Sequence, residues 1–196
     1  MNNIKIQKDI TSHRSKVLPI SWGTRDLSII HLVFTLISLF VPAIMHIQGL
    51  PVRTILPMHW VVLLAGMLYG WRGGIIIGIL TPISSFLLTG YPLPVKLLPM
   101  IFELVSYGTI AGLLREKSKL NDFVIVTLSL LTGRIVFILT ILITGGYVSE
   151  GAFGTYLSAA LMPGIVAGIM QIALIPTISR TTLSITKSIN KKGNPD

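Results

Sequence analysis

Residues 95–114 read VKLLPMIFELVSYGTIAGLL, an apolar run that carries one acidic residue, Glu103, near its centre. A helix of about 20 apolar residues is long enough to cross the hydrocarbon core of a bilayer. The run is apolar on all sides, whereas a strand of a membrane barrel alternates apolar and polar residues over about 10 positions. This stretch therefore predicts a membrane-spanning helix with an ionisable side chain deep in the bilayer.

The other apolar runs are Leu27–Met45, Met58–Tyr69, Gly73–Leu88, Phe123–Ile143 and Thr155–Ile178. Together they predict an all-α integral membrane protein, with a bundle of six transmembrane helices in residues 27–178. Residues 1–26 and 179–196 are then basic tails. The run Met58–Tyr69 rises only about 18 Å as a helix, so by length alone it is also compatible with a re-entrant segment.

The distribution of charge predicts the topology of these spans. The formal net charge is +9, and all Lys and Arg residues except Arg53, Lys96 and Arg134 fall on one side of a six-span arrangement. Basic residues mark the cytoplasmic side, so both termini are predicted to be cytoplasmic in a plasma membrane. A re-entrant second run would weaken this asymmetry. Because the charges flank apolar runs, we expect the lipid bilayer and not nucleic acid as their partner.

The composition excludes several classes of protein. Charged residues make up 12% of the chain, against about 25% in a typical soluble domain. The chain has no cysteine, which rules out disulfides, thiol catalysis and cysteine-ligated metals. The sequence lacks G-x-x-x-x-G-K-[ST], H-E-x-x-H and G-x-S-x-G, so neither ATP binding by a P-loop nor hydrolase chemistry is predicted. We expect no enzyme activity, no cofactor and no metal.

Two ionisable residues lie inside predicted spans and form the main candidate site. Counted from the predicted outer ends of their runs, Glu103 lies about 12 Å deep and Arg134 about 15 Å deep. An ionised group at mid-membrane costs about 2.5–3.5 kcal/mol even on the milder insertion scale, and such groups usually mark function. The matching depths are compatible with a structural salt bridge or with a shared ligand.

Other polar and aromatic residues extend the candidate substrate-binding set. His46 and His59 lie at the predicted outer mouth, where organic ligand contact, structural hydrogen bonding and metal binding are the alternatives; two histidines are a weak metal signal. Trp60 and Tyr91 fit an interfacial aromatic belt, or they stack on a flat ligand. Tyr107 is a polar group inside a span, four residues after Glu103.

Small residues spaced by four form another pattern. Gly66 and Gly70 close the second run, and Gly74 and Gly78 open the third. Such spacing places two glycines on one helix face and lets helix backbones approach closely in lipid. Packing inside the bundle and docking to another membrane protein are both compatible with it.

The order and spacing of several local patterns resemble the substrate-binding S components of the energy-coupling factor (ECF) transporters. The resemblance covers about residues 27–178. Its patterns are LPMHWVVLLAG (56–66), YGWRGG (69–74), TPISS (81–85), FELVSYG (102–108), GLL (112–114), GRIV (133–136) and PGI (163–165).

The resemblance implies capture of a vitamin or vitamin precursor near the outer face. It also implies association with a membrane T component and two ATP-binding subunits, which supply the energy for import. The first span of the family often carries an Ala-x-x-x-Ala docking motif; here only Thr35 and Ser38 are small in the corresponding stretch. With these two residues, Gly70, Gly74 and Gly78 form the candidate docking set.

The leading hypothesis is thus a high-affinity substrate-capture subunit of an ATP-driven ECF importer. The alternative is an autonomous ion- or proton-coupled carrier that uses Glu103 and Arg134. The substrate is not specified by the sequence, because a paired Glu103 and Arg134 select neither a cation nor an anion.

Overall fold

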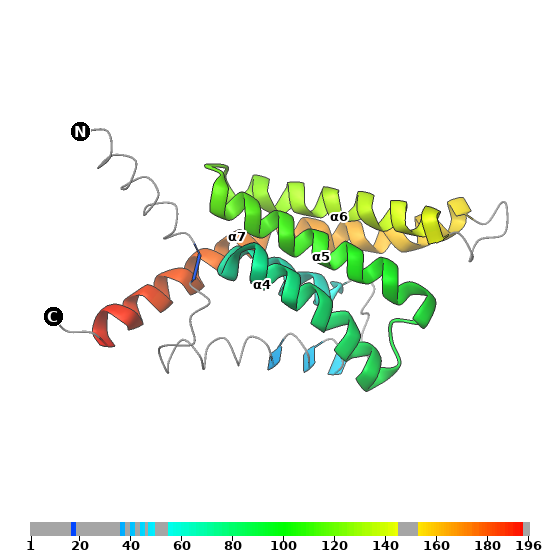
Figure 1. The fold of residues 1–196 in the computed structure, drawn as a ribbon, viewed down its shortest axis with the longest axis horizontal. Coiled ribbons are helices and arrows are strands. Elements are labelled where there is room, and N and C mark those ends of the chain that lie inside the picture. The colour runs from blue at the N-terminus through cyan, green and yellow to red at the C-terminus, as the bar shows by residue number, and fades with distance from the viewer. Residues whose placement is uncertain are drawn as a thin grey trace.

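The computed structural model describes residues 17–18, 36–37, 40–41, 44–45, 47–49, 55–144 and 153–193. Its long helices are α4 (Pro57–Thr89), α5 (Pro94–Lys117), α6 (Asp122–Thr144) and α7 (Phe153–Gly193). Figure 1 shows them lying along one another. α4 packs against α5, α5 against α6, and α7 against both α6 and α4. The last five predicted runs all lie within these helices, whereas Leu27–Met45 is described only at isolated helical residues.

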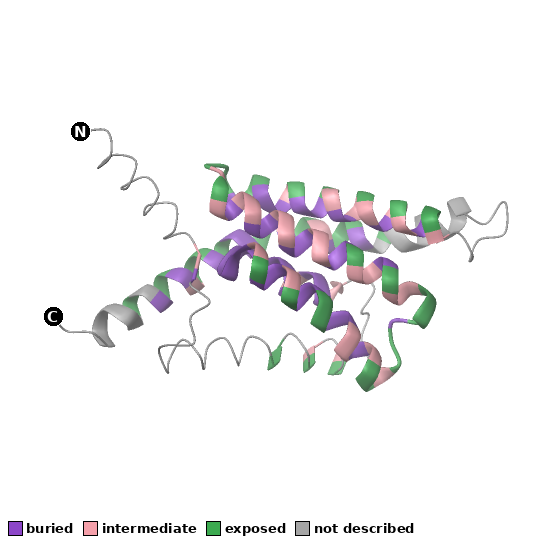
Figure 2. Cartoon of the chain, in the orientation of Figure 1, coloured by how far each residue is buried: buried purple, intermediate pink, exposed green. Residues whose placement is uncertain are grey.

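All four of these helices are long and apolar enough to cross a membrane. Their outward faces carry exposed apolar side chains at helical spacing, such as Ile135 and Leu139 on α6 and Ile165 and Ile169 on α7. Buried residues line the inward faces (Figure 2). Exposed apolar faces of this kind suit contact with lipid acyl chains. The prediction of an all-α membrane protein is confirmed, while the total of six spans and the cytoplasmic position of the termini stay predictions.

Helix α4 reverses direction at Gly70, so it contains both the second and the third predicted runs. Gly70 has φ 75° and ψ −172°, which is not helical and which glycine adopts readily because it lacks a Cβ. A Cβ placed on Gly66 or on Gly74 would lie within 2.5 Å of the Gly108 oxygen, although eight residues of straight helix rise about 12 Å. The chain therefore folds back on itself at this point.

The close packing of α4 on α5 depends on glycine. A Cβ on Gly108 would lie 2.5 Å from the Gly74 carbonyl oxygen, and one on Gly78 would lie 3.0 Å from the backbone of Val105. At the reversal, a Cβ on Gly112 would overlap the backbone of Gly70 and its neighbour. Of the candidate docking residues, Gly70, Gly74 and Gly78 thus face α5 within the chain, which is the internal-packing alternative. Thr35 and Ser38 lie outside the described residues.

The reversal is held by polar contacts at the same end of the bundle. The backbone N–H of Trp71 donates to Glu116 Oε1 at 3.2 Å, which caps the second segment of α4. Leu18, in the predicted N-terminal tail, is buried in the hydrophobic core. Its N–H donates to the carbonyl oxygen of Leu68 at 2.6 Å. The carbonyls of the last helical turn lack partners within a helix, so this bond satisfies one of them.

Much of the predicted C-terminal tail is helical. Helix α7 continues to Gly193, beyond the predicted end of the last span at Ile178. Arg180 of α7 contacts Asp122, the first residue of α6, and Asp122 also contacts Arg115 near the end of α5. Leu18 and Arg180 therefore lie at one end of the bundle, and the side of the membrane that this end faces remains a prediction.

Candidate ligand-binding site

Glu103 lies in the interior of the bundle, about 14 Å along α5 from its start at Pro94. The residue is only 1% exposed. Its neighbours on α5 are mainly apolar, and Leu104 is fully buried. A buried carboxylate in such surroundings is stable only when other groups compensate its charge. The partners of Glu103 therefore decide what this position does.

Two side chains contact the same oxygen of Glu103. Arg134 of α6 places Nη1 2.9 Å from Oε1. Tyr107, one turn further along α5, donates its hydroxyl to Oε1 at 2.7 Å. The salt bridge, one of the two arrangements with which the matching depths are compatible, is therefore present. Charge-assisted hydrogen bonds of this kind are about twice as strong as neutral ones, and this pair joins α5 to α6 inside the bundle.

His59 of α4 completes the group. Its Nε2 lies 3.5 Å from Glu103 Oε1, and its ring centroid lies 5.1 Å from that of Tyr107 at an interplanar angle of 54°. The 3.5 Å approach brings opposite charges close if the imidazole is protonated, but it does not have hydrogen-bond geometry. We call His59, Glu103, Tyr107 and Arg134 the Glu103 cluster; it draws side chains from α4, α5 and α6.

Two glycines provide space for side chains of this cluster, because they lack a Cβ. A Cβ on Gly133 of α6 would overlap the ring of Tyr107. A Cβ on Gly164 of α7 would overlap the guanidinium of Arg134. The GRIV and PGI patterns thus matter to the site through the absence of a side chain, which a search for polar residues in the sequence does not detect.

The remaining predicted ligand contacts lie elsewhere. Trp60 donates its Nε1–H to the carbonyl oxygen of Ile55 at 2.8 Å, across the start of its own helix. Tyr91 is half exposed in the connection between α4 and α5. Neither residue contributes a hydrogen bond or ion pair to Glu103. His46 lies outside the described residues, so its proposed ligand contact stays a prediction.

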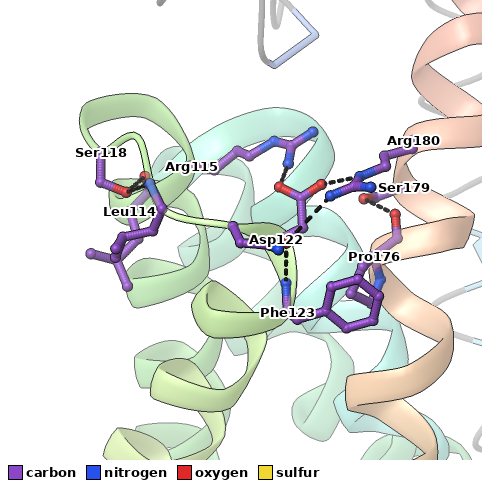
Figure 3. A network of polar contacts seen from close by, with 10 residues as sticks. Leu114, Arg115, Ser118, Asp122, Phe123, Pro176, Ser179 and Arg180 are labelled. Atoms are coloured by element: carbon purple, nitrogen blue, oxygen red, sulfur yellow. Dashed lines mark hydrogen bonds and ion pairs between the residues drawn. The ribbon is translucent and has the colours of Figure 1, made fainter.

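A second charged group, which the sequence reading missed, lies at the end of the bundle. The Asp122 carboxylate contacts Arg115 through one oxygen and Arg180 Nε through the other, the latter at 2.5 Å (Figure 3). Arg180 also donates to Asn121 Oδ1 at 3.4 Å. We call Arg115, Asp122 and Arg180 the Asp122 cluster. In the sequence, this cluster was indicated by two basic residues and one acidic residue at the predicted inner ends of three consecutive spans.

Metal-ligand chemistry finds little support in the part of the chain that the structure describes. No group of three or more His, Cys, Asp or Glu side chains in these ranges is arranged to hold a metal ion. The Glu103 cluster contains one carboxylate, one imidazole and a competing guanidinium. This donor set suits hydrogen bonding and ion pairing with an organic molecule.

Comparison with known proteins agrees with the resemblance of the local patterns. The family model described as "ECF transporter, substrate-specific component" matches residues 27–179. This range includes all four residues of the Glu103 cluster. No curated protein and no solved structure gives a significant match to the chain. The chain therefore belongs to the family of ECF transporter substrate-specific components, which are multi-pass transporter subunits of prokaryotic plasma membranes and not enzymes.

Proposed function

We propose that this chain is the high-affinity substrate-capture subunit of an ATP-driven ECF importer for a vitamin or vitamin precursor. It binds its ligand near the outer face and delivers it by association with a membrane T component and two ATP-binding subunits. Family membership supports the role of a substrate-specific subunit. The proposal adds the substrate class, the position of the ligand and the partners.

The observation that carries the proposal is the Glu103 cluster. Four polar side chains from three helices converge inside the bundle. Replacing a buried ion pair by well-packed apolar residues is often neutral or stabilising, so packing alone does not explain such a cluster. Intramembrane ionisable residues instead mark ligand or ion sites by default. We therefore assign the cluster to the substrate site.

The predicted orientation of the bundle supports an outward position for this site. If the end that carries Leu18, Arg115 and Arg180 faces the cytoplasm, the Glu103 cluster lies on the outer side of the Asp122 cluster. Its polar groups bind a small molecule, and unmet hydrogen bonds reject molecules of the wrong pattern. No step of this mechanism makes or breaks a covalent bond, and the energy for release comes from the partner subunits.

A second candidate function is the autonomous carrier coupled to an ion or proton gradient. The observation that favours it is the Glu103–Arg134 ion pair itself, because paired carboxylates and cations inside membranes also form proton relays. The two functions differ in their energy source, so a transport assay separates them.

The test uses the full chain purified with its bound small molecule, which mass spectrometry identifies. Uptake of that labelled molecule is then measured in proteoliposomes that contain the chain alone or the chain with T component and both ATPases. We expect ATP-dependent uptake only in the complete set. Uptake by the chain alone under an ion gradient would favour the carrier. Absence of any bound molecule, together with no binding across a panel of vitamins and precursors, would contradict the proposal.

A further inference from the structure

The Glu103 cluster contains one side chain whose hydrogen-bonding capacity is unfilled. His59 is 2% exposed, and neither of its ring nitrogens has a hydrogen-bond partner among the described residues. Buried polar groups in folded proteins nearly always have such a partner, and each exception calls for an explanation. A bound molecule that joins the cluster would supply the missing partner.

The charges of the cluster are already matched within it. Glu103 Oε1 receives Arg134 Nη1 at 2.9 Å and the Tyr107 hydroxyl at 2.7 Å. One carboxylate and one guanidinium cancel, so the cluster is neutral when the imidazole is neutral. Beside a neutral imidazole, an ion brought into these surroundings would lack a compensating charge, and burial of an uncompensated charge is strongly unfavourable.

From these two observations, and resting on the proposed function, we propose that the substrate meets the Glu103 cluster with an uncharged hydrogen-bond donor that bonds His59 Nδ1. The chemical class is an alcohol, an amide or a ring N–H. An ionised carboxylate, phosphate or ammonium is excluded from this contact, although the substrate can carry charge elsewhere.

The geometry of His59 selects a donor. Nε2 is the nitrogen that faces the carboxylate, 3.5 Å from Oε1. Although no hydrogen bond forms, the negative charge of the carboxylate favours the neutral tautomer that turns an N–H toward it, with the proton on Nε2 and Nδ1 left as an acceptor. The ring is fixed in this orientation against Tyr107. An acceptor at Nδ1 is satisfied by an N–H or O–H group and left unsatisfied by a carbonyl or carboxylate.

Side-chain substitutions at His59 separate the two nitrogens. In asparagine the polar atoms are bonded to Cγ, as Nδ1 is in histidine, whereas in glutamine they lie one bond further out, near the position of Nε2. Phenylalanine keeps a ring against Tyr107 and removes both nitrogens. We expect His59→Asn to bind substrate within about threefold of the unchanged chain, and His59→Gln and His59→Phe to bind about tenfold more weakly.

The experiment measures binding by calorimetry with the full chain in lipid nanodiscs. The probes are the compound that copurifies with the chain and one matched pair, nicotinamide and nicotinate, in which a carboxylate replaces an amide donor at the same ring position. If either member binds, nicotinamide should bind at least about tenfold more tightly than nicotinate. This comparison needs only the unchanged chain, so it holds even if a His59 variant fails to fold.

Each remaining outcome has a definite meaning. Equal or tighter binding of the anionic member would overturn the inference and leave the proposed function standing. Equal weakening of binding by His59→Asn and His59→Gln would also overturn the inference. Unchanged binding in all three variants would overturn it as well, because His59 would then be structural or bonded to water. If the copurified compound alone binds, the difference between Asn and Gln decides. If nothing copurifies and nothing binds, the proposed function fails and the inference fails with it.

Discussion

The two buried carboxylates among the described residues differ in what surrounds them. Asp122 begins helix α6 beside the connection from α5, and one of its two arginines, Arg180, has a side chain that is 55% exposed. Glu103 lies within α5, and the side chain of its arginine is only 22% exposed. A helix N-terminus also favours a negative charge by its dipole. The start of a helix therefore adds to the stabilisation of Asp122, whereas Glu103, within a helix, depends on the side chains around it alone.

The comparison teaches how to separate a structural charge from a candidate binding site. In the Asp122 cluster, both carboxylate oxygens are matched by arginines, and the cluster fastens α5, α6 and α7 at one end. In the Glu103 cluster, Oε1 receives the contacts from Arg134, Tyr107 and His59, and neither ring nitrogen of the buried His59 has a hydrogen-bond partner among the described residues. Unfilled hydrogen bonding, and not charge alone, distinguishes the site.

The largest expected effect concerns the Glu103–Arg134 pair. Arg134→Met should lower the free energy of unfolding by about 3–5 kcal/mol, because it leaves a buried carboxylate without its cation. The double variant Glu103→Gln/Arg134→Met should lose much less, since neither charge remains. Unfolding in mixed detergent micelles measures both. A double variant that is as unstable as the sum of the two single variants would show that the pair is not coupled.

The next effect concerns the close contact of α4 and α5, which brings His59 to Glu103. Gly108→Ala should cost about 1–3 kcal/mol, because its Cβ would meet the backbone of Gly74. Gly168→Ala is the matched control, since a Cβ there has no atom within 4 Å, and its effect should stay within about 0.5 kcal/mol. The same unfolding assay compares them, and equal losses would contradict the packing described above.

Substitution of Asp122 should lower the free energy of unfolding by a similar amount, without weakening substrate binding. Asp122→Asn leaves the buried Arg115 without its carboxylate and should cost about 1–3 kcal/mol. Arg180→Gln removes only the exposed partner and should cost about 0–1 kcal/mol. Thermal unfolding of the two variants provides the ranking. The reverse order would mean that Arg180, and not Arg115, holds this end of the bundle.

The smallest effect concerns the hydroxyl of Tyr107. Tyr107→Phe keeps the ring beside Gly133 and removes one hydrogen bond to Glu103, so it should cost about 0.5–1.5 kcal/mol. In the Glu103→Gln background the same change should cost less, because a neutral acceptor forms a weaker bond. An identical cost in both backgrounds would argue against a bond to the ionised carboxylate.

The sequence predicted much of this fold because lipid imposes simple constraints. Long apolar runs located the described helices, and counting residues from the ends of two runs brought Glu103 and Arg134 to the same depth. The pair exists at 2.9 Å. Separating Met58–Tyr69 from Gly73–Leu88 implied a reversal between them, and the two helical segments do meet at the non-helical Gly70.

Other features of the site required the packed structure. The sequence placed His59 at an outer mouth with His46, whereas packing of α4 on α5 carries it to Glu103. The contributions of Gly133 and Gly164 depend on which side chain lies opposite a missing Cβ. The Asp122 cluster depends on the lateral positions of three helices, which residue spacing along one helix does not specify.

The account is tested most directly by the affinity of the copurified small molecule for two neutralised variants. Calorimetry on Glu103→Gln and Asp122→Asn, each in lipid nanodiscs, compares the two clusters under the same conditions. We predict that Glu103→Gln weakens binding by about tenfold or more and that Asp122→Asn changes it by less than about twofold. Equal affinities in the two variants, or a larger loss in Asp122→Asn, would contradict the assignment of the Glu103 cluster as the substrate site.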